Sequence, residues 1–150
     1  MYYNIFFSTY SISSAVCFVV DYFYPKTRVK PESKKKVVND YLDIIPLTSL
    51  NLLLSYPVFY YSEKYLEENN NDVNIPLYLL YWLTVADIVF YSMHYLHHYS
   101  HFYKYIHCIH HKYRYTYGAG AIYAHPIDHY TINLLSTFLP IYIYPSNELV

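Results

Sequence analysis

The histidines of this chain are concentrated in one stretch, residues 87–130, which reads DIVFYSMHYLHHYSHFYKYIHCIHHKYRYTYGAGAIYAHPIDHY. All nine histidines of the 150-residue chain lie within it. The residues between them are largely Tyr, Leu, Ile and Phe, which disfavours a solvated histidine-rich tract. Histidines grouped among apolar residues indicate a metal site, because imidazole is a ligand for iron, zinc, copper and nickel alike.

Two groups of histidines in this stretch have the spacing of metal ligands. His94 and His98 are four residues apart, which places both on one face of a helix. His107, His110 and His111 follow as H-x2-H-H, and the same helical periodicity turns them toward one side. We therefore predict that these five histidines ligate a metal.

An acidic residue, Asp87, lies in the apolar run just before the histidines. It shares one helical stripe with Tyr91 and His94. An ionisable residue inside such a run is a candidate for function. Two interpretations of Asp87 remain open, namely support of the metal ligands from the second coordination sphere and a hydrogen bond that only packs two helices.

Charge and motif content exclude several classes of function. The chain has 10 basic and 11 acidic residues, and a nucleic-acid partner would require a clear basic excess. It contains no Rossmann or P-loop fingerprint and no H-E-x-x-H protease motif. No glutamate stands three residues before a histidine, as the motif of soluble di-iron bundles requires.

Four apolar stretches, residues 3–24, 41–61, 75–93 and 132–144, indicate helices that enter a membrane. The first three approach the roughly 20 residues that cross a bilayer, whereas prolines disturb the short fourth stretch. The mean hydropathy of +0.04 conceals this pattern, since the 24 tyrosines score as polar although tyrosine favours the membrane boundary. We predict an all-α membrane protein with about four transmembrane or membrane-embedded helices and a cytoplasmic histidine-rich helical segment.

The loops between these stretches differ in charge. Residues 26–36 are basic, residues 62–74 are acidic, and residues 94–130 carry further basic side chains. Because positive loops remain in the cytoplasm, three crossings place the N-terminus outside and the histidines in the cytoplasm. We take the first stretch as a retained anchor, since it lacks the features of a cleaved signal peptide. Cys17 and Cys108 do not form a metal or redox spacing, and we expect two free thiols.

In order along the chain, these motifs resemble the fatty acid hydroxylase and sterol desaturase superfamily. The matching motifs are Asp87 and Tyr91 before His94-x3-His98, Tyr103-Lys104 before His107-x2-His110-His111, and Ala124-His125-Pro126-Ile127-Asp128. Their spacing is similar to that of methylsterol monooxygenases and sterol C5-desaturases. The resemblance implies one partial membrane domain over residues 1–150, with its histidine-motif core at 87–130.

The resemblance also implies a chemistry. Members of the family are oxidoreductases of lipid or sterol biosynthesis in which a di-iron centre uses O2 on a membrane lipid. Electrons come from NAD(P)H through cytochrome b5 or a reductase, at the endoplasmic reticulum or, for a viral protein, a host membrane. The implied residues are His125 as a sixth ligand and Asp87, Tyr91 and Asp128 around the ligands, with no catalytic residue separate from the ligands.

Members of the family carry a third histidine cluster further along, and these 150 residues contain none. We therefore expect a chain that is truncated before this cluster, has little hydroxylase activity alone, and takes a separate C-terminal fragment as one partner. His97 and His101 fall outside the family motifs and are not expected to be ligands. Two other readings remain open: a truncated, non-catalytic membrane protein that binds metal, and a zinc-dependent membrane hydrolase.

Overall fold

The computed structural model describes residues 2–24, 32–69, 71–113 and 117–146. These residues form helices and no strand, so the predicted all-α fold is confirmed. The elements are α1 (Tyr2–Phe23), α2 (Lys34–Glu68), α3 (Ile75–His97), α4 (Ser100–Tyr105), the 3-10 helices η2 (His107–Lys112) and η3 (Gly118–Ile122), α5 (Pro126–Asp128), the π-helix η4 (His129–Leu134) and α6 (Leu135–Ile143).

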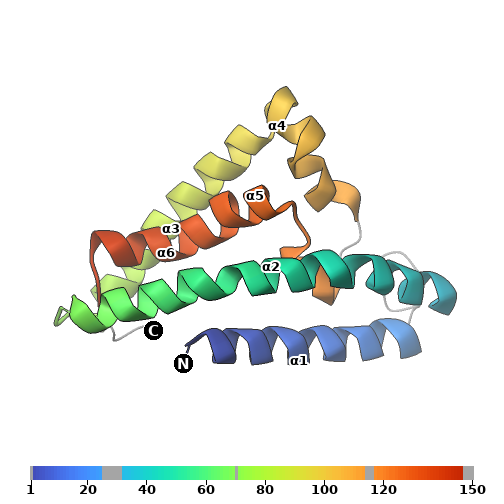
Figure 1. Ribbon diagram of the computed structural model, residues 1–150, viewed down its shortest axis with the longest axis horizontal. Helices are drawn as coiled ribbons and strands as arrows, with labels where there is room; N and C mark the ends of the chain where they lie inside the picture. The colour runs from blue at the N-terminus through green and yellow to red at the C-terminus, as the bar shows by residue number, and fades with distance from the viewer. Residues whose placement is uncertain (1, 25–31, 70, 114–116, 147–150) are drawn as a thin grey trace.

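The long helices form a wedge (Figure 1). Helix α1 runs alongside α2, while α3 leaves the far end of α2 and rises to the apex of the wedge. The chain turns back there through α4 and η2, and η3 packs against both α1 and α2. Helix α6 then returns along α3. The histidines at the end of α3 and in α4 and η2 therefore lie toward the apex of the wedge.

Local signals in the sequence account for where the long helices begin. The Ser33 hydroxyl accepts a hydrogen bond from the amide of Lys36 at the start of α2. The Asn74 side chain accepts one from the amide of Leu77 at the start of α3, where Pro76 occupies the first turn. Both contacts satisfy amides that a helix leaves unpaired at its N-terminus.

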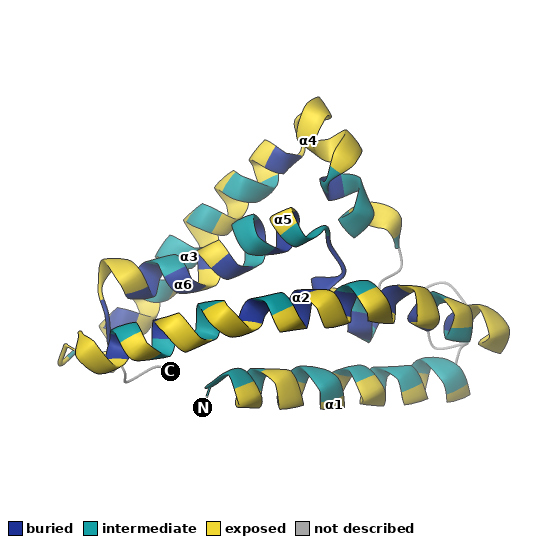
Figure 2. Ribbon diagram, in the orientation of Figure 1, coloured by how far each residue is buried: buried dark blue, intermediate teal, exposed yellow. Residues whose placement is uncertain are grey.

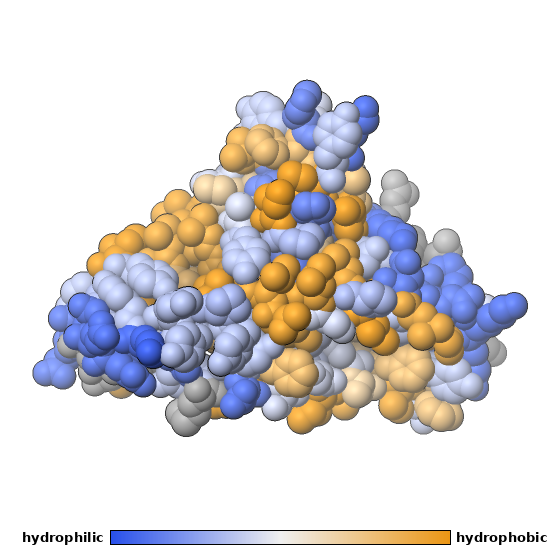
Figure 3. All heavy atoms as spheres, viewed as in Figure 1, coloured by the Kyte–Doolittle hydropathy of each residue, from blue (hydrophilic) through white to orange (hydrophobic). Residues whose placement is uncertain are grey.

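Three helices, α1, α2 and α3, are long and apolar enough to cross a membrane. Helix α1 has no buried residue, which leaves its apolar side chains for lipid (Figure 2). Hydrophilic residues gather at the two far ends of the wedge and at its apex, with hydrophobic residues between them (Figure 3). The fourth apolar stretch covers the end of η4 and all of α6. Together with α5 these elements follow one another without a break from Pro126 to Ile143, and this run is not among the three candidate spans.

Helix α6 is held against α3 by hydrogen bonds to its backbone. The Tyr81 hydroxyl donates to the carbonyl of Pro140 at 3.0 Å, and the Trp82 indole donates to the carbonyl of Thr137 at 3.2 Å. Pro140 has no amide hydrogen to donate to the carbonyl of Ser136, which weakens the backbone bonding of α6. The two donors from α3 bind neighbouring carbonyls and hold α6 to α3. Helix α6 is thus embedded against other helices rather than spanning by itself.

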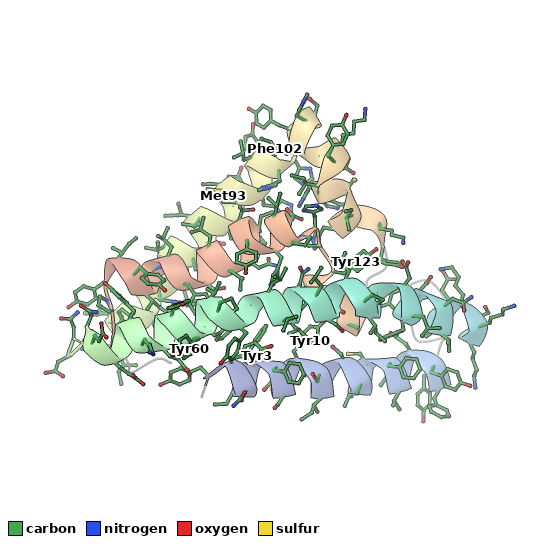
Figure 4. The ribbon with its side chains drawn as sticks, in the orientation of Figure 1. Tyr3, Tyr10, Tyr60, Met93, Phe102 and Tyr123 are labelled. Carbon is green, nitrogen blue, oxygen red and sulfur yellow. The ribbon has the colours of Figure 1, made fainter. Side chains whose placement is uncertain are left out.

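The segment 117–124 is inserted beside α1 and α2, where it needs partners for its backbone. Figure 4 shows Tyr10 pointing from α1 toward α2, and its hydroxyl donates to the carbonyl of Ala119 at 2.5 Å. The Asn51 side-chain amide donates to the carbonyls of Ile122 and Ala124, both at 2.8 Å. Backbone without regular structure is tolerated at membrane depth only when other parts of the protein satisfy it in this way.

Gly118 permits the closest approach between this segment and α1. A Cβ at Gly118 would lie 2.3 Å from the Cβ of Cys17, a distance that side chains do not tolerate. Cys17 and Cys108 are free thiols, as predicted.

Candidate metal centre

Four histidines from two helices converge at the apex of the wedge. His94 lies in the last turn of α3 and His98 at its C-cap, while His107 and His111 belong to η2. One ring nitrogen of each lies within 4.8 Å of those of the other three. The short helix α4 reverses the chain between the two pairs, so the two predicted clusters face each other.

The distances within each pair of this cluster fit the coordination of one metal ion, and the four nitrogens together spread slightly wider, to 4.8 Å. The Nε2 atoms of His94 and His98 are 3.0 Å apart, and so are those of His107 and His111. Imidazole nitrogens about 2.1 Å from a metal are about 3.0 Å apart at a right angle and about 4.2 Å apart when opposite. The four side chains are therefore suited in chemistry and spacing to hold a metal.

Asp128 determines how the His107 ring is presented. Both side chains are buried, and His107 Nδ1 donates to the two carboxylate oxygens at 2.9 and 3.0 Å. Because the proton resides on Nδ1, the lone pair of Nε2 points into the cluster. A carboxylate behind a ligating imidazole fixes the ring and makes it a stronger ligand. This is the position that the predicted supporting role of Asp128 requires.

Two of the clustered histidines are kept neutral by their surroundings. Burial lowers the pKa of His107 below its usual value, although Asp128 acts in the opposite direction. Burial and the neighbouring His107 also lower the pKa of His111. A metal binds the unprotonated imidazole, so both rings are in their binding form at neutral pH.

His110 and His125, the other two predicted ligands, are not part of the group of four. His110 Nδ1 donates to the carbonyl of Tyr123 at 3.4 Å, and the side chain lies beside the cluster. His125 caps α5, where its Nδ1 accepts a hydrogen bond from the amide of Ile127 at 3.2 Å. The two residues differ because His110 lines the same cavity as His94, whereas the His125 ring is turned to its own helix.

The predicted support from Asp87 and Tyr91 has no counterpart among the described contacts of the four histidines. Asp87 is exposed on α3, and Tyr91 is 68% exposed and stacks on Tyr95. Phe90 instead stacks on His94, with ring centroids 5.7 Å apart. A residue four positions before a ligand lies beneath it on a helix, so this spacing could have identified Phe90.

The two histidines that were not expected to be ligands lie outside the group of four. His97 is buried, and its Nδ1 donates to the carbonyl of Met93 at 2.7 Å, a residue labelled in Figure 4. Its Nε2 lies 3.2 Å from the hydroxyl of Thr131, which ties the end of α3 to η4. His101 is exposed on α4.

A cavity of about 170 Å³ adjoins the cluster. Histidines and a carboxylate form one part of its wall and small or apolar side chains form most of the rest; the lining residues are Phe90, His94, His107, His110, Ala121, Ala124, Asp128, Ile132 and Asn133. The cluster thus faces a space of mixed character, with polar side chains on one part of its wall and apolar side chains on the other. Sequence reasoning missed Asn133, because its position depends on the π-helix η4, which no motif predicts.

Comparison with known proteins gives two relatives. A fatty acid hydroxylase of Mycosarcoma maydis is 42% identical over 53 residues, which are 35% of this chain and 14% of that protein. A protein of Dictyostelium discoideum that carries the name methylsterol monooxygenase is 25% identical over 114 residues, 71% of this chain and 42% of that protein. The matched regions span less than half the length of either relative.

No family model and no solved structure matches the chain. Similarity to known proteins therefore comes from the two relatives and from the motifs that carry the histidine cluster. Both relatives are members of the superfamily that the motifs indicated. This chain is similar in sequence to the fatty acid hydroxylase and sterol desaturase superfamily, as the order of its histidine motifs predicted.

Proposed function

We propose that this chain provides histidine ligands to the di-iron centre of a membrane oxidoreductase that uses O2 to hydroxylate or desaturate a sterol or fatty acid. The observation that carries the proposal is the convergence of His94, His98, His107 and His111 with a carboxylate behind one of them. Four nitrogens within 4.8 Å suit one ion, and His110 and His125 are the candidates for a second.

When bound, the iron supplies the oxidation of an unactivated C–H bond with O2, using electrons from NAD(P)H delivered by cytochrome b5 or a reductase. The side chains of this chain have simpler tasks. His107 is held in one tautomer by Asp128, so its lone pair stays directed at the metal. Phe90, Ala121 and Ile132 line the neighbouring cavity with apolar surface that admits a hydrocarbon and disfavours water.

The site lies where a substrate could reach it from the membrane. His94 belongs to α3, a candidate span, and the cavity lies between α3 and the segment 121–133. We propose that the histidine end of α3 faces the cytoplasm of an endoplasmic reticulum membrane, in line with the basic and acidic loops. Impermeant thiol labelling of a cysteine introduced at Asn71 tests this orientation, and labelling from the cytoplasmic side would contradict it.

The proposal is tested first by metal binding. The purified chain in detergent is loaded with Fe(II) without oxygen and its iron content is measured. We expect His107→Ala to lower the iron content far more than His101→Ala, a matched change at an exposed histidine outside the group. Equal losses in the two variants would contradict the ligand assignment.

Activity is tested separately from binding. The chain is expressed in yeast that lack methylsterol oxidase or C5-desaturase, and sterols and hydroxylated fatty acids are analysed. We expect little or no product, because the matched motifs supply five or six of the roughly eight histidine nitrogens that two irons require. A product that disappears with His107→Ala would support the oxidoreductase and show that these histidines suffice. Stoichiometric zinc with hydrolysis of an ester would favour the hydrolase instead.

A further inference from the structure

The π-helix η4 brings a polar side chain into the wall of the cavity. Residues five positions apart point about 140° away from each other on an α-helix, but the wider π turn brings them nearer to one side. Asp128 and Asn133 are five positions apart, and both line the cavity beside His107. Asn133 is therefore placed next to the metal ligands by the irregular turn.

The orientation of the Asn133 side-chain amide follows from a series of hydrogen bonds that links Ser55, His129 and Asn133. The Ser55 hydroxyl has one hydrogen, which it donates to the carbonyl of Asn51 at 2.8 Å. His129 Nε2, 2.9 Å from the Ser55 oxygen, must then be the donor in that contact. His129 Nδ1 is consequently unprotonated and accepts from the Asn133 side-chain nitrogen at 3.2 Å.

This series of hydrogen bonds requires a neutral His129 ring, and the burial of the ring favours the neutral form. His129 is buried at 1% exposure, and burial lowers its pKa to about 4. The ring thus carries a single proton at neutral pH, the one on Nε2. Ser55 and His129 together hold the amide nitrogen of Asn133 against the His129 ring.

The Asn133 side-chain oxygen is left without a donor. It accepts no hydrogen bond from any residue in the part of the chain that the structure describes. The neighbouring walls include Phe90, Ala121 and Ile132, which offer no side-chain donor. A ligand that displaces water from this oxygen must supply a donor itself, because a polar group buried without a partner is costly.

We propose that Asn133 is a specificity-determining residue whose amide oxygen accepts a hydrogen bond from a hydroxyl group of the lipid in the cavity, with His129 and Ser55 as positioning residues. The inference builds on the proposed function, since it assumes that the lipid enters beside the histidine cluster. It names a substrate class: a lipid with a hydroxyl close to the carbon presented to the metal. The oxygen selects such a lipid over the hydrocarbon of equal length.

The test compares 1-dodecanol with dodecane as probes of the full chain in lipid nanodiscs. Native mass spectrometry measures bound probe directly, and cobalt(II) loading adds a visible spectrum that responds to a ligand near the histidines. The measured quantity is the ratio of the two affinities in each variant. Because both probes partition into the same membrane in every variant, the change in this ratio isolates the contribution of the side chain.

We expect Asn133→Leu to reduce the preference for dodecanol roughly 5- to 150-fold, the range for leaving one buried polar group, here the hydroxyl of the alcohol, without a partner, and without loss of cobalt. Asn39→Leu, at an exposed asparagine of α2, should leave the ratio unchanged. His129→Leu should reduce the preference, and His129→Gln, which can still donate and accept, should restore part of it. A general packing defect would not discriminate between the two histidine variants in this way.

The experiment distinguishes a wrong role for Asn133 from a wrong proposed function. Cobalt binding with an unchanged ratio in Asn133→Leu would overturn the inference and leave the metal site standing. No cobalt binding by the unaltered chain would overturn the proposed function, while the mass spectrometric ratio would still decide the role of Asn133. If Asn133→Leu does not fold, the smaller Asn133→Ala serves, because alanine has no acceptor, and an unchanged ratio in that folded variant counts equally against the inference.

Discussion

The contact between Asp128 and His107 allows a quantitative prediction for metal affinity. The change Asp128→Asn keeps the size of a side chain that is 2% exposed, next to a histidine that is 0% exposed. It replaces one of the two oxygens, at 2.9 and 3.0 Å from His107 Nδ1, by an NH2 group that cannot accept. It also removes the negative charge that strengthens the remaining hydrogen bond.

The expected loss follows from these two changes. Removing a partner behind a metal-bound histidine typically lowers metal affinity about 10- to 100-fold, or roughly 1.4 to 2.7 kcal/mol. One neutral hydrogen bond can survive in Asp128→Asn, so we expect a value near the lower end of this range. Asp128→Ala, which leaves His107 without any partner, should reach the upper end.

The assay is a competition titration of cobalt(II) against a coloured chelator, with the chain in detergent at pH 7.5. Asp87→Asn is the matched control, because it makes the same chemical change at an exposed position on α3. We expect that variant to stay within about twofold of the unaltered chain, as is usual for an exposed side chain without close partners. An unchanged affinity in Asp128→Asn, or equal losses in both variants, would refute the proposed support of His107.

Three further predictions follow from the geometry. His98→Ala should lower the stoichiometry of bound cobalt, measured by metal analysis, whereas His101→Ala should not. Acidification from pH 6.5 to 4 should lower the free energy of unfolding by on the order of 3 kcal/mol through His129. The pKa of this histidine is about 4 in the folded chain, so as the pH falls the unfolded chain binds the proton at a higher pH than the folded chain does. In circular dichroism melts, the melting temperature of His129→Leu should therefore depend less on pH than that of the unaltered chain. Gly118→Ala should destabilise the chain by about 1–3 kcal/mol, since the added Cβ meets Cys17 at 2.3 Å, and Cys17→Gly in the same chain should restore the melting temperature.

The sequence by itself determined the helical architecture and the heart of the candidate site. Apolar stretches of about 20 residues predict the three candidate spans, because a helix must cover the bilayer with apolar side chains. The spacing of His94 and His98 predicts one ligand pair, and the H-x2-H-H motif predicts a second group of His107, His110 and His111, since helical periodicity is a local property. The structure brings four of these five side chains together, without His110. These conclusions needed no knowledge of which helices touch.

Only the tertiary structure decided which residues surround those ligands. Asp128 reaches His107 across 21 positions, and Asn51 reaches the carbonyl of Ala124 across 73. Asn133 lies in the cavity wall because the π turn of η4 changes the direction of its side chain. No local sequence motif predicts that π turn. Helical spacing predicts what one turn presents to the next, whereas contacts between distant segments depend on how the helices pack.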